Sequence, residues 1–539
     1  MPYFFFTEGT WVRVPSFHSE MRRAIVSLLL VASQAATDCP PKCSNDVCRT
    51  ALRPCQLQTV PVYTAWVRNH TLQPPGSESL HVAEGSVNWP QLNGITSAFA
   101  VLPGIARPDE VQAVLAMVQA DDAALPFDSD SDSVDGMPTF EFFIEANGNG
   151  VNMVESATPG RADKNKLNTH PSRRPIREKL RALMQPIVNN RITPYVRHRF
   201  AKECGRGKGR NCQPCYSLIR RYLPDERRSH ASHHDAHALV TVVVSLSSWG
   251  RDYAGGLYVE SGRGSRQTIA LHSGDAIVHQ PDLLHGVHVT EGARWSWILW
   301  YRDSDTCEEH GHEWFHGCAE EGNPICQIHH VLKLGSMPGM NDADMVAQAI
   351  ALTQRAADGG LGSAMNRIAK AYLKKLPSSL PYDPAAATRL YRQAADPESY
   401  YLLAQLLLEF SSRPEQLSSG SDRIITDATA EAVTMFEAAA VRGHAAAMYN
   451  LGVAHLYGFG VPTRDPQLAS EWFLASGLPE GLWAASLHRT AVGNADEGGR
   501  LAAQARRLGF GSGGRQELLA HVNLHSPWPD TSGPRPPEW

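Results

Sequence analysis

Two apolar stretches in the middle of the chain have the composition of buried strands. Residues 238–246 are β-branched and apolar, and residues 294–301 are largely aromatic. Such runs, bounded by turn residues, are typical of strands inside a sheet. Gly, Ser and Arg turns separate shorter apolar stretches that predict further strands. These stretches are residues 99–102, 139–144, 217–223, 255–259 and 276–278.

Helical spacing of apolar residues precedes most of these strands. One helix is predicted to begin at Pro108, because apolar residues then recur at helical spacing and Pro is favoured in a first turn. A second helix is predicted over residues 176–187, where Pro186 disturbs the last turn. Short strands supported by helices predict an α+β fold. We expect a double-stranded β-helix of the jelly-roll or cupin-like kind, with N-terminal supporting helices.

After about residue 305 the chain becomes rich in Ala and repeats itself with a period typical of helical-pair solenoids. The most complete unit runs from Ala446 to Ala469, with a Gly-rich turn at 457–461 between two helices. Small residues are needed where paired helices approach, and Gly where the chain turns. This unit resembles the Sel-one-like subclass of tetratricopeptide-type repeats. We therefore predict an all-α helical-repeat solenoid over residues 306–512.

Metal-ligand side chains lie on both sides of the first apolar strand. His233 and Asp235 flank His234, so both point to the same face of an extended segment. His285 follows further along the chain, at the start of another strand-like segment. Two histidines and one carboxylate are the facial set that holds non-haem Fe(II) and leaves coordination positions open. The sequence therefore predicts an iron site at His233, Asp235 and His285.

A cationic site is predicted next to the iron site. Arg294 follows the turn at Gly292 and can pair with a dicarboxylate through two parallel hydrogen bonds, which Lys cannot do. Ser296 alternates onto the same face of the strand. We therefore expect Arg294, assisted by Ser296, to hold a dicarboxylate co-substrate.

These segments together resemble the 2-oxoglutarate- and Fe(II)-dependent dioxygenases, most closely the prolyl 4-hydroxylase-like branch. The family pattern of His-x-Asp, Gly-Gly-hydrophobic, His, Gly and Arg is met in order, over roughly residues 95–303. It is met by His233 and Asp235, Gly255-Gly256-Leu257, His285, Gly292 and Arg294. The spacing from His285 to Arg294 is slightly shorter than the commonest form.

The resemblance implies a role for each matched residue. His233, Asp235 and His285 would be the iron ligands, and Arg294 would bind the distal carboxylate of 2-oxoglutarate. Tyr222 falls near a tyrosine that assists in the family, although its spacing to the triad is slightly longer than usual. The implied reaction converts 2-oxoglutarate to succinate and carbon dioxide while a C–H bond is hydroxylated. In the family that bond belongs to a peptidyl proline, and ascorbate rescues oxidised iron.

Other histidines compete for these roles. His279 and His288 are alternatives for the third ligand, but the order His, Gly, Arg favours His285. His230, His234 and His237 are expected to be neighbours of the site rather than ligands.

The N-terminal segment predicts the compartment. Met21 opens a basic stretch, residues 24–32 are apolar and residues 33–35 suit a signal peptidase, so residues 1–35 are predicted to be an upstream extension followed by a signal peptide. The apolar segment is too short to span a bilayer, and no stable membrane span is expected. The protein is therefore predicted to be secreted or to reside in the endoplasmic reticulum lumen. In that setting Asn69 begins a glycosylation sequon.

Cysteine content and charge agree with this compartment. The ten cysteines form an even total and suggest disulfides, whose connectivity cannot be deduced from spacing. The pair Cys212 and Cys215 has two alternatives, a redox-active motif or half of a zinc site. The formal net charge of -5 argues against nucleic acid as an obligate partner.

These observations divide the chain and define its alternatives. Residues 36–94 are expected to be a Cys- and Pro-rich lead-in, 95–305 the dioxygenase domain, 306–512 the repeats and 513–539 a disordered tail. The preferred function is hydroxylation of proline in a protein or peptide, as in procollagen-proline 4-dioxygenases, with the repeats holding a protein partner. One alternative is a dioxygenase acting on lysine, another residue or a small molecule. Another is an inactive adaptor that binds proteins through its repeats.

Overall fold

The structure is a computed structural model of the whole chain. It describes strands 4–7 and 10–13, residues 52–54 and 57, and residues 60–510 except 76, 93, 120–126, 128–131, 133, 135–136, 147–173, 205–210, 263, 304–306, 308–310, 335–342, 376–379, 420–424 and 426. The predicted signal peptide, the four cysteines between residues 39 and 55, and the predicted disordered tail lie outside the described residues.

The chain divides into two compact units, Met1–Thr59 and Val60–Trp539. In the first unit, strands β1 (Phe4–Thr7) and β2 (Thr10–Arg13) form an antiparallel hairpin. The sheets and the later helices all lie in the second unit.

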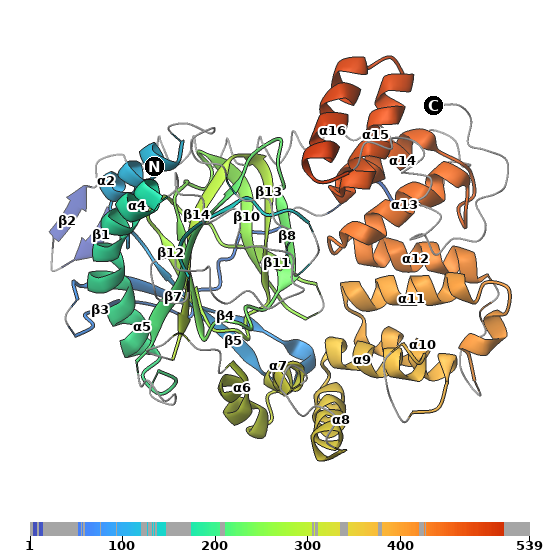
Figure 1. Cartoon of the computed structure of the whole chain (residues 1–539), viewed down its shortest axis with the longest axis horizontal. Coiled ribbons are helices and arrows are strands. Elements are labelled where there is room, and N and C mark those ends of the chain that lie inside the picture. The colour runs from blue at the N-terminus through green and yellow to red at the C-terminus, as the bar shows by residue number, and fades with distance from the viewer. Residues whose placement is uncertain are drawn as a thin grey trace. The chain divides into compact units, whose positions relative to one another are not determined.

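Two antiparallel sheets form the β domain of the second unit (Figure 1). The larger sheet has the order β3-β4-β5-β12-β9-β14-β7-β6 and the smaller one the order β11-β10-β13-β8. The strands of the larger sheet are β3 (Arg68–Leu72), β4 (Leu80–Asn88), β5 (Thr96–Leu102), β12 (Ala276–His279), β9 (Val240–Ser245), β14 (Arg294–Arg302), β7 (Gln213–Tyr222) and β6 (Glu141–Ala146). Those of the smaller sheet are β11 (Arg266–Thr268), β10 (Tyr253–Glu260), β13 (His285–Gly292) and β8 (Ser229–His233). This is the double-sheeted jelly-roll that the sequence predicts.

The core has two layers, one on each face of the larger sheet. Val243 of β9 packs between the sheets with Leu257 of β10, in a cluster that joins both sheets. Its neighbours Val242 and Val244 point the other way, toward the helices. Successive side chains of a strand alternate between faces, so an apolar run such as 238–246 fits a strand that is buried on both sides.

Three helices cover the outer face of the larger sheet. They are α2 (Pro108–Gln119), α4 (Arg174–Ile187) and α5 (Thr193–Arg199). Helix α4 contains Pro186, and a π-helical turn (Val188–Ile192) follows it before α5 begins. The predicted disturbance thus takes the form of a widened turn rather than a break.

The sheet begins earlier in the chain than residue 95. Strand β4 pairs antiparallel with β5, and β3 pairs with β4, so part of the segment expected to be a Cys- and Pro-rich lead-in is sheet. Strand β13 likewise continues to Gly292, through the turn expected at residues 290–292. Gly292 has a φ of 70°, and a Cβ there would lie 2.0 Å from the Asp252 carbonyl oxygen, so only Gly fits this position.

Helices make up the rest of the described chain. The first three are α6 (Gly311–Glu320), α7 (Pro324–Leu334) and α8 (Ala343–Asp358). Then follow α9 (Gly362–Tyr372), α10 (Pro384–Ala394), α11 (Pro397–Glu409), α12 (Ala428–Ala440), α13 (Ala445–Tyr457), α14 (Pro466–Ser476), α15 (Pro479–Ala491) and α16 (Ala495–Arg507). From α9 onward successive helices stack on one another (Figure 1). Helices α10 and α14 each begin with an Asp cap followed by Pro, an effective start signal.

Three disulfides join described cysteines: Cys204–Cys212, Cys215–Cys307 and Cys318–Cys326. Cys212 and Cys215 therefore have different partners, which excludes both a redox pair and half of a zinc site at this motif. Disulfides persist in oxidising compartments.

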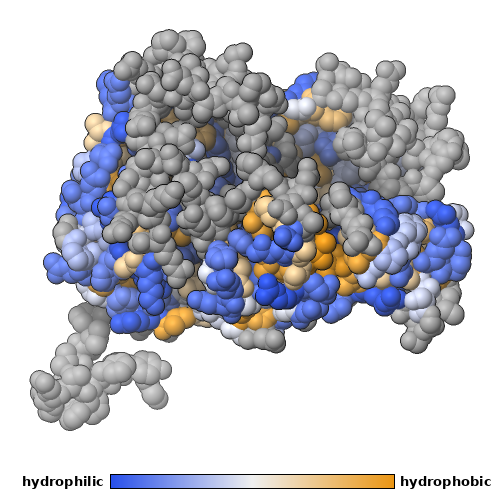
Figure 2. Space-filling view, turned by 60° about the horizontal axis from the view of Figure 1, so that its bottom comes forward, coloured by the Kyte–Doolittle hydropathy of each residue, from blue (hydrophilic) through white to orange (hydrophobic). Residues whose placement is uncertain are grey.

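Hydrophilic residues predominate on the face in Figure 2, with a smaller group of apolar residues near its centre. Within the described part of the chain, no helix is both long and apolar enough to cross a membrane.

Candidate metal centre

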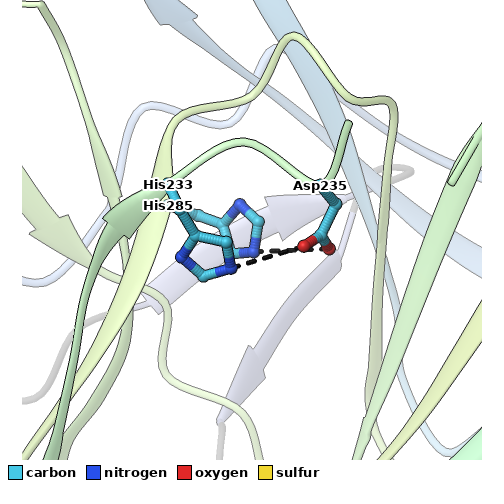
Figure 3. Close-up of side chains that lie close together, drawn as sticks. All are labelled: His233, Asp235 and His285. Atoms are coloured by element: carbon cyan, nitrogen blue, oxygen red, sulfur yellow. Dashed lines mark ion pairs between the residues drawn. The ribbon is translucent and has the colours of Figure 1, made fainter. Parts of the chain in front are cut away.

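The predicted ligands converge at the edge of the smaller sheet (Figure 3). Strand β8 ends at His233, and β13 begins at His285 directly opposite it in the antiparallel register. Asp235 lies two residues beyond His233. Its Oδ1 is 3.3 Å from the His233 Nε2, and its Oδ2 is 3.6 Å from the His285 Nε2. One ligand atom from each of the three residues lies within 4.8 Å of the other two, a spacing that one ion can bridge.

Backbone hydrogen bonds orient both imidazoles. The His233 Nδ1 donates to the Ala231 carbonyl oxygen (2.9 Å), and the His285 Nδ1 donates to the Leu283 carbonyl oxygen (3.1 Å). A proton on Nδ1 leaves the Nε2 lone pair free, and Nε2 is the atom that faces Asp235. Metal-binding histidines are commonly held in this way. Both rings therefore present the tautomer that a metal needs.

The surroundings of Asp235 and His285 set the protonation of these two ligands. Asp235 and His285 are buried. Burial lowers the pKa of His285 well below its usual value. Burial alone would raise the pKa of Asp235, but the electrostatic influence of the His285 and His233 imidazoles outweighs it and holds that pKa well below its usual value. A neutral imidazole beside an ionised carboxylate is the form that binds a divalent metal.

Thr241 fixes the carboxylate from the larger sheet. Its hydroxyl donates a 2.7 Å hydrogen bond to the Asp235 Oδ2. Sequence reasoning did not single out Thr241. The available signal was its position as a polar residue in the middle of an apolar strand.

A buried arginine that pairs with no carboxylate of the described residues lies in the same domain. Arg294 begins β14 directly opposite Tyr222 of β7, and only 1% of it is exposed. Its guanidinium carbon is 5.7 Å from the ring centre of Tyr222 and 5.9 Å from that of Tyr253, and its Nη1 lies 3.4 Å from the Ser296 hydroxyl. The structure therefore places Tyr222 and Ser296 beside Arg294.

Polar atoms in this cluster lack partners. Among the described residues, nothing hydrogen-bonds the Nε and Nη2 of Arg294, the Tyr222 hydroxyl or the indole nitrogen of Trp249. Trp249 packs against the cluster that contains Tyr222 and Tyr253, and sequence reasoning missed both Trp249 and Tyr253. Burying an unpaired cation is strongly unfavourable. These donors thus fit a buried carboxylate.

The remaining histidines take other partners. His230 contacts the Asp132 carboxylate at 2.7 Å, and His288 is exposed on β13. His279 lies beside His285, with ring centres 4.4 Å apart, but its Nδ1 donates to the Gln280 carbonyl oxygen. His234 donates to the Pro281 carbonyl oxygen, and the His237 ring packs on Trp300. Within the described residues, His233, Asp235 and His285 form the one group of three with metal-site spacing.

Fold and triad together define the class of the protein. A double-stranded β-helix with a His-x-Asp and distant-His triad, as in the 2-oxoglutarate/Fe(II) oxygenases, is followed by a helical-repeat region. This architecture confirms the resemblance found in the sequence. Residues 362–396 and 445–476 match the Sel1 repeat family. No curated protein matches the chain significantly.

Solved structures similar to parts of the chain include both Sel1 repeat proteins and 2-oxoglutarate/Fe(II) oxygenases. A Sel1 repeat protein from Oxalobacter formigenes is 18% identical, over 38% of this chain and 82% of that one, with a TM-score of 0.31. A 2OG-Fe(II) oxygenase family oxidoreductase from Burkholderia pseudomallei is 18% identical, over 39% of this chain and 86% of that one, with a TM-score of 0.27. A Pseudomonas putida prolyl-4-hydroxylase is 16% identical, over 38% of this chain and 91% of that one, with a TM-score of 0.24.

Proposed function

We propose that the protein is an Fe(II)- and 2-oxoglutarate-dependent dioxygenase that hydroxylates peptidyl proline in the secretory pathway. The observation that carries the proposal is the pairing of two sites in one β domain. One is a triad of two imidazoles and a carboxylate, and the other is a buried arginine with no acidic partner among the described residues. A triad alone fits many divalent metals. The added cationic site fits a co-substrate with a second carboxylate.

Each residue has a proposed task. His233, Asp235 and His285 hold Fe(II), whose chemistry with oxygen and 2-oxoglutarate supplies the oxidation of a C–H bond. Arg294 binds the distal carboxylate of 2-oxoglutarate, and the Tyr222 hydroxyl and Ser296 add hydrogen bonds to it. The apolar side chains around Tyr222 keep water from the buried guanidinium, which strengthens its pairing with an anion.

Substrate and compartment complete the proposal. Proline in a protein or peptide is the substrate implied by the prolyl 4-hydroxylase-like motif order, with ascorbate as the reductant that restores Fe(II). The Sel1 repeats would hold a protein partner, since stacked helical pairs form extended binding surfaces. The three disulfides between described cysteines and the predicted signal peptide support the endoplasmic reticulum lumen or secretion.

The test is succinate release from 2-oxoglutarate by the purified protein with Fe(II) and ascorbate, with and without proline-rich peptides. His233→Ala removes one ligand, and His288→Ala, at an exposed histidine of β13, is its matched control. We expect peptide-stimulated turnover that His233→Ala abolishes and His288→Ala retains, with the added oxygen located on proline by mass spectrometry. Turnover without peptide stimulation would reject proline as the substrate. No turnover and no metal binding would leave the repeat-based adaptor.

A further inference from the structure

Helix α7 contacts the segment that carries the first two ligands. The His329 ring lies 4.8 Å from the His234 ring and nearly perpendicular to it. Ala236 packs against a small cluster formed by Phe315, Ala319 and Cys326. His234 and Ala236 alternate with His233 and Asp235 along the chain. The helix therefore supports the ligand segment from the side away from the metal site.

The same helix also supports the segment that carries the third ligand. Ile325 and Ile328 of α7 belong to a buried cluster that Leu284, the neighbour of His285, packs against. This helix thus contacts the chain next to each of the three ligands. A shift of α7 would change the separation of the ligand segments.

Hydrogen bonds link the two ligand segments in this layer. The His234 Nδ1 donates to the Pro281 carbonyl oxygen at 3.1 Å. Trp89 stacks over the His234 ring, with ring centres 6.3 Å apart, and its indole nitrogen donates to the Ser97 hydroxyl. Ser97 donates in turn to the Asp282 carbonyl oxygen at 2.9 Å. His234 is therefore held between α7 on one side and the 281–285 segment on the other.

Helix α7 is itself fixed to α6. The Cys318–Cys326 disulfide joins the two helices, and Phe315 of α6 stacks on His329 with ring centres 5.0 Å apart. The first Sel1 match begins only at residue 362. The α6–α7 hairpin thus lies between the sheet domain and the matched repeats in sequence, and it contacts both the metal-binding segments and the helices that follow.

We propose that the α6–α7 hairpin is a structural part of the metal centre, in which His329 and the Cys318–Cys326 disulfide position the ligands and set the affinity for a divalent metal. This inference rests on the proposed metal site. Groups behind metal ligands change affinity by about 10- to 100-fold when removed, because the ligands then have to be ordered at the moment of binding. His329 acts through His234 and is a positioning residue.

The chain offers a matched control for the disulfide. Cys318–Cys326 and Cys204–Cys212 both join residues that are eight positions apart, so their loss releases similar loop entropy in the unfolded chain. Cys204 and Cys212 lie in the core on the helix-covered face of the larger sheet. The triad is on the other sheet. Only the loss of the Cys318–Cys326 disulfide is therefore expected to change the metal affinity.

The experiment measures the dissociation constant of Co(II), a spectroscopic substitute for Fe(II), by its visible absorption in the full chain without oxygen. We expect Cys318→Ser with Cys326→Ser to weaken binding about 10-fold or more and to alter the Co(II) spectrum. Cys204→Ser with Cys212→Ser should leave both unchanged. Equal affinity in the two double variants would overturn the inference.

Two single variants test the positioning role even if the cysteine variants fail to fold. His329→Phe keeps an aromatic ring between Phe315 and His234, so its Co(II) affinity and spectrum should stay close to those of the natural protein. His329→Ala removes the ring and should weaken Co(II) binding by about the same factor as the double variant Cys318→Ser with Cys326→Ser. Wild-type affinity in His329→Ala would overturn the inference while leaving the metal centre intact. No Co(II) binding by the natural protein would instead refute the metal centre itself.

Discussion

Arg294→Met separates a ligand-binding role of the buried guanidinium from a structural one. Arg294 is 1% exposed and pairs with no carboxylate among the described residues. Taking an ion out of water has an effective penalty of several kcal/mol even after relaxation. Met fills much of the same volume without a charge. We therefore expect the ligand-free variant to be at least as stable as the natural protein.

The matched control is an arginine that has a partner. Arg221 contacts Glu226 through two hydrogen bonds of 2.7 and 3.1 Å, and both side chains are buried. Arg221→Met leaves the Glu226 charge buried without this partner, a change that typically costs about 3–5 kcal/mol. The two substitutions are chemically identical and lie on neighbouring strands, but their effects on the free energy of unfolding should have opposite signs or differ by several kcal/mol.

Ligand-induced stabilisation gives the second readout. A ligand at 100 times its dissociation constant raises the free energy of unfolding by about 2.7 kcal/mol. Losing two charge-assisted hydrogen bonds removes about 3 kcal/mol of binding, or roughly 150-fold in affinity. At the same 2-oxoglutarate concentration, Arg294→Met should then gain only about 0.3 kcal/mol.

Urea denaturation, with Mn(II) in place of Fe(II) and with or without 2-oxoglutarate, measures both effects. The reasoning would be refuted if Arg294→Met destabilised the ligand-free protein as much as Arg221→Met does. It would also be refuted if 2-oxoglutarate stabilised Arg294→Met as strongly as it stabilises the natural protein.

Two further predictions concern pH and the repeats. Burial raises the pKa of Asp282 to about 6, so the native state keeps a proton that the unfolded chain releases from about pH 4 upward, and stability falls as pH rises from about 4 to 6. Asp282→Asn should remove this fall of up to about 3 kcal/mol, measured by urea denaturation across that range; an unchanged pH profile would contradict it. At Gly452 of α13, an added Cβ would lie 2.6 Å from the Phe473 ring, so Gly452→Ala should destabilise the repeats by about 1–3 kcal/mol. Thermal unfolding would measure this, and Co(II) affinity should stay unchanged; wild-type stability would contradict the packing argument.

The fold could be predicted where apolar residues dominate a strand on both of its faces. The apolar run at 238–246 predicts β9 because both faces of that strand are buried, and no register is needed to recognise it. Strand β4 escaped prediction for the opposite reason. Its middle holds Gly85, where the Phe99 ring fills the space that a Cβ would take, and Gly weakens the pattern of a strand. The signal there lies in a contact with a different strand.

The three metal ligands could be predicted from the sequence, but the residues that support them could not. The two-residue period of extended chain predicts His233 and Asp235 on one face, and the motif order selects His285 over its competitors; the structure brings the three together although β8 ends at His233. The hydrogen bond from Thr241 and the contacts of His329 come from chain segments with no local pattern that points to the triad. Their positions depend on how the sheets and α7 pack, which local patterns do not encode.

The ligand segment has a second set of contacts. His233 and Asp235 face the metal site, and the alternate residues His234 and Ala236 contact α7. Strand β8 ends at His233 and the chain turns at Ala236, but both ligands are covalent neighbours of His234, so packing that fixes His234 also restrains the ligands on either side of it. A residue between two ligands can therefore control metal affinity without touching the metal. This explains why His234, which is a poor candidate as a ligand, donates a hydrogen bond to the segment that carries the third ligand.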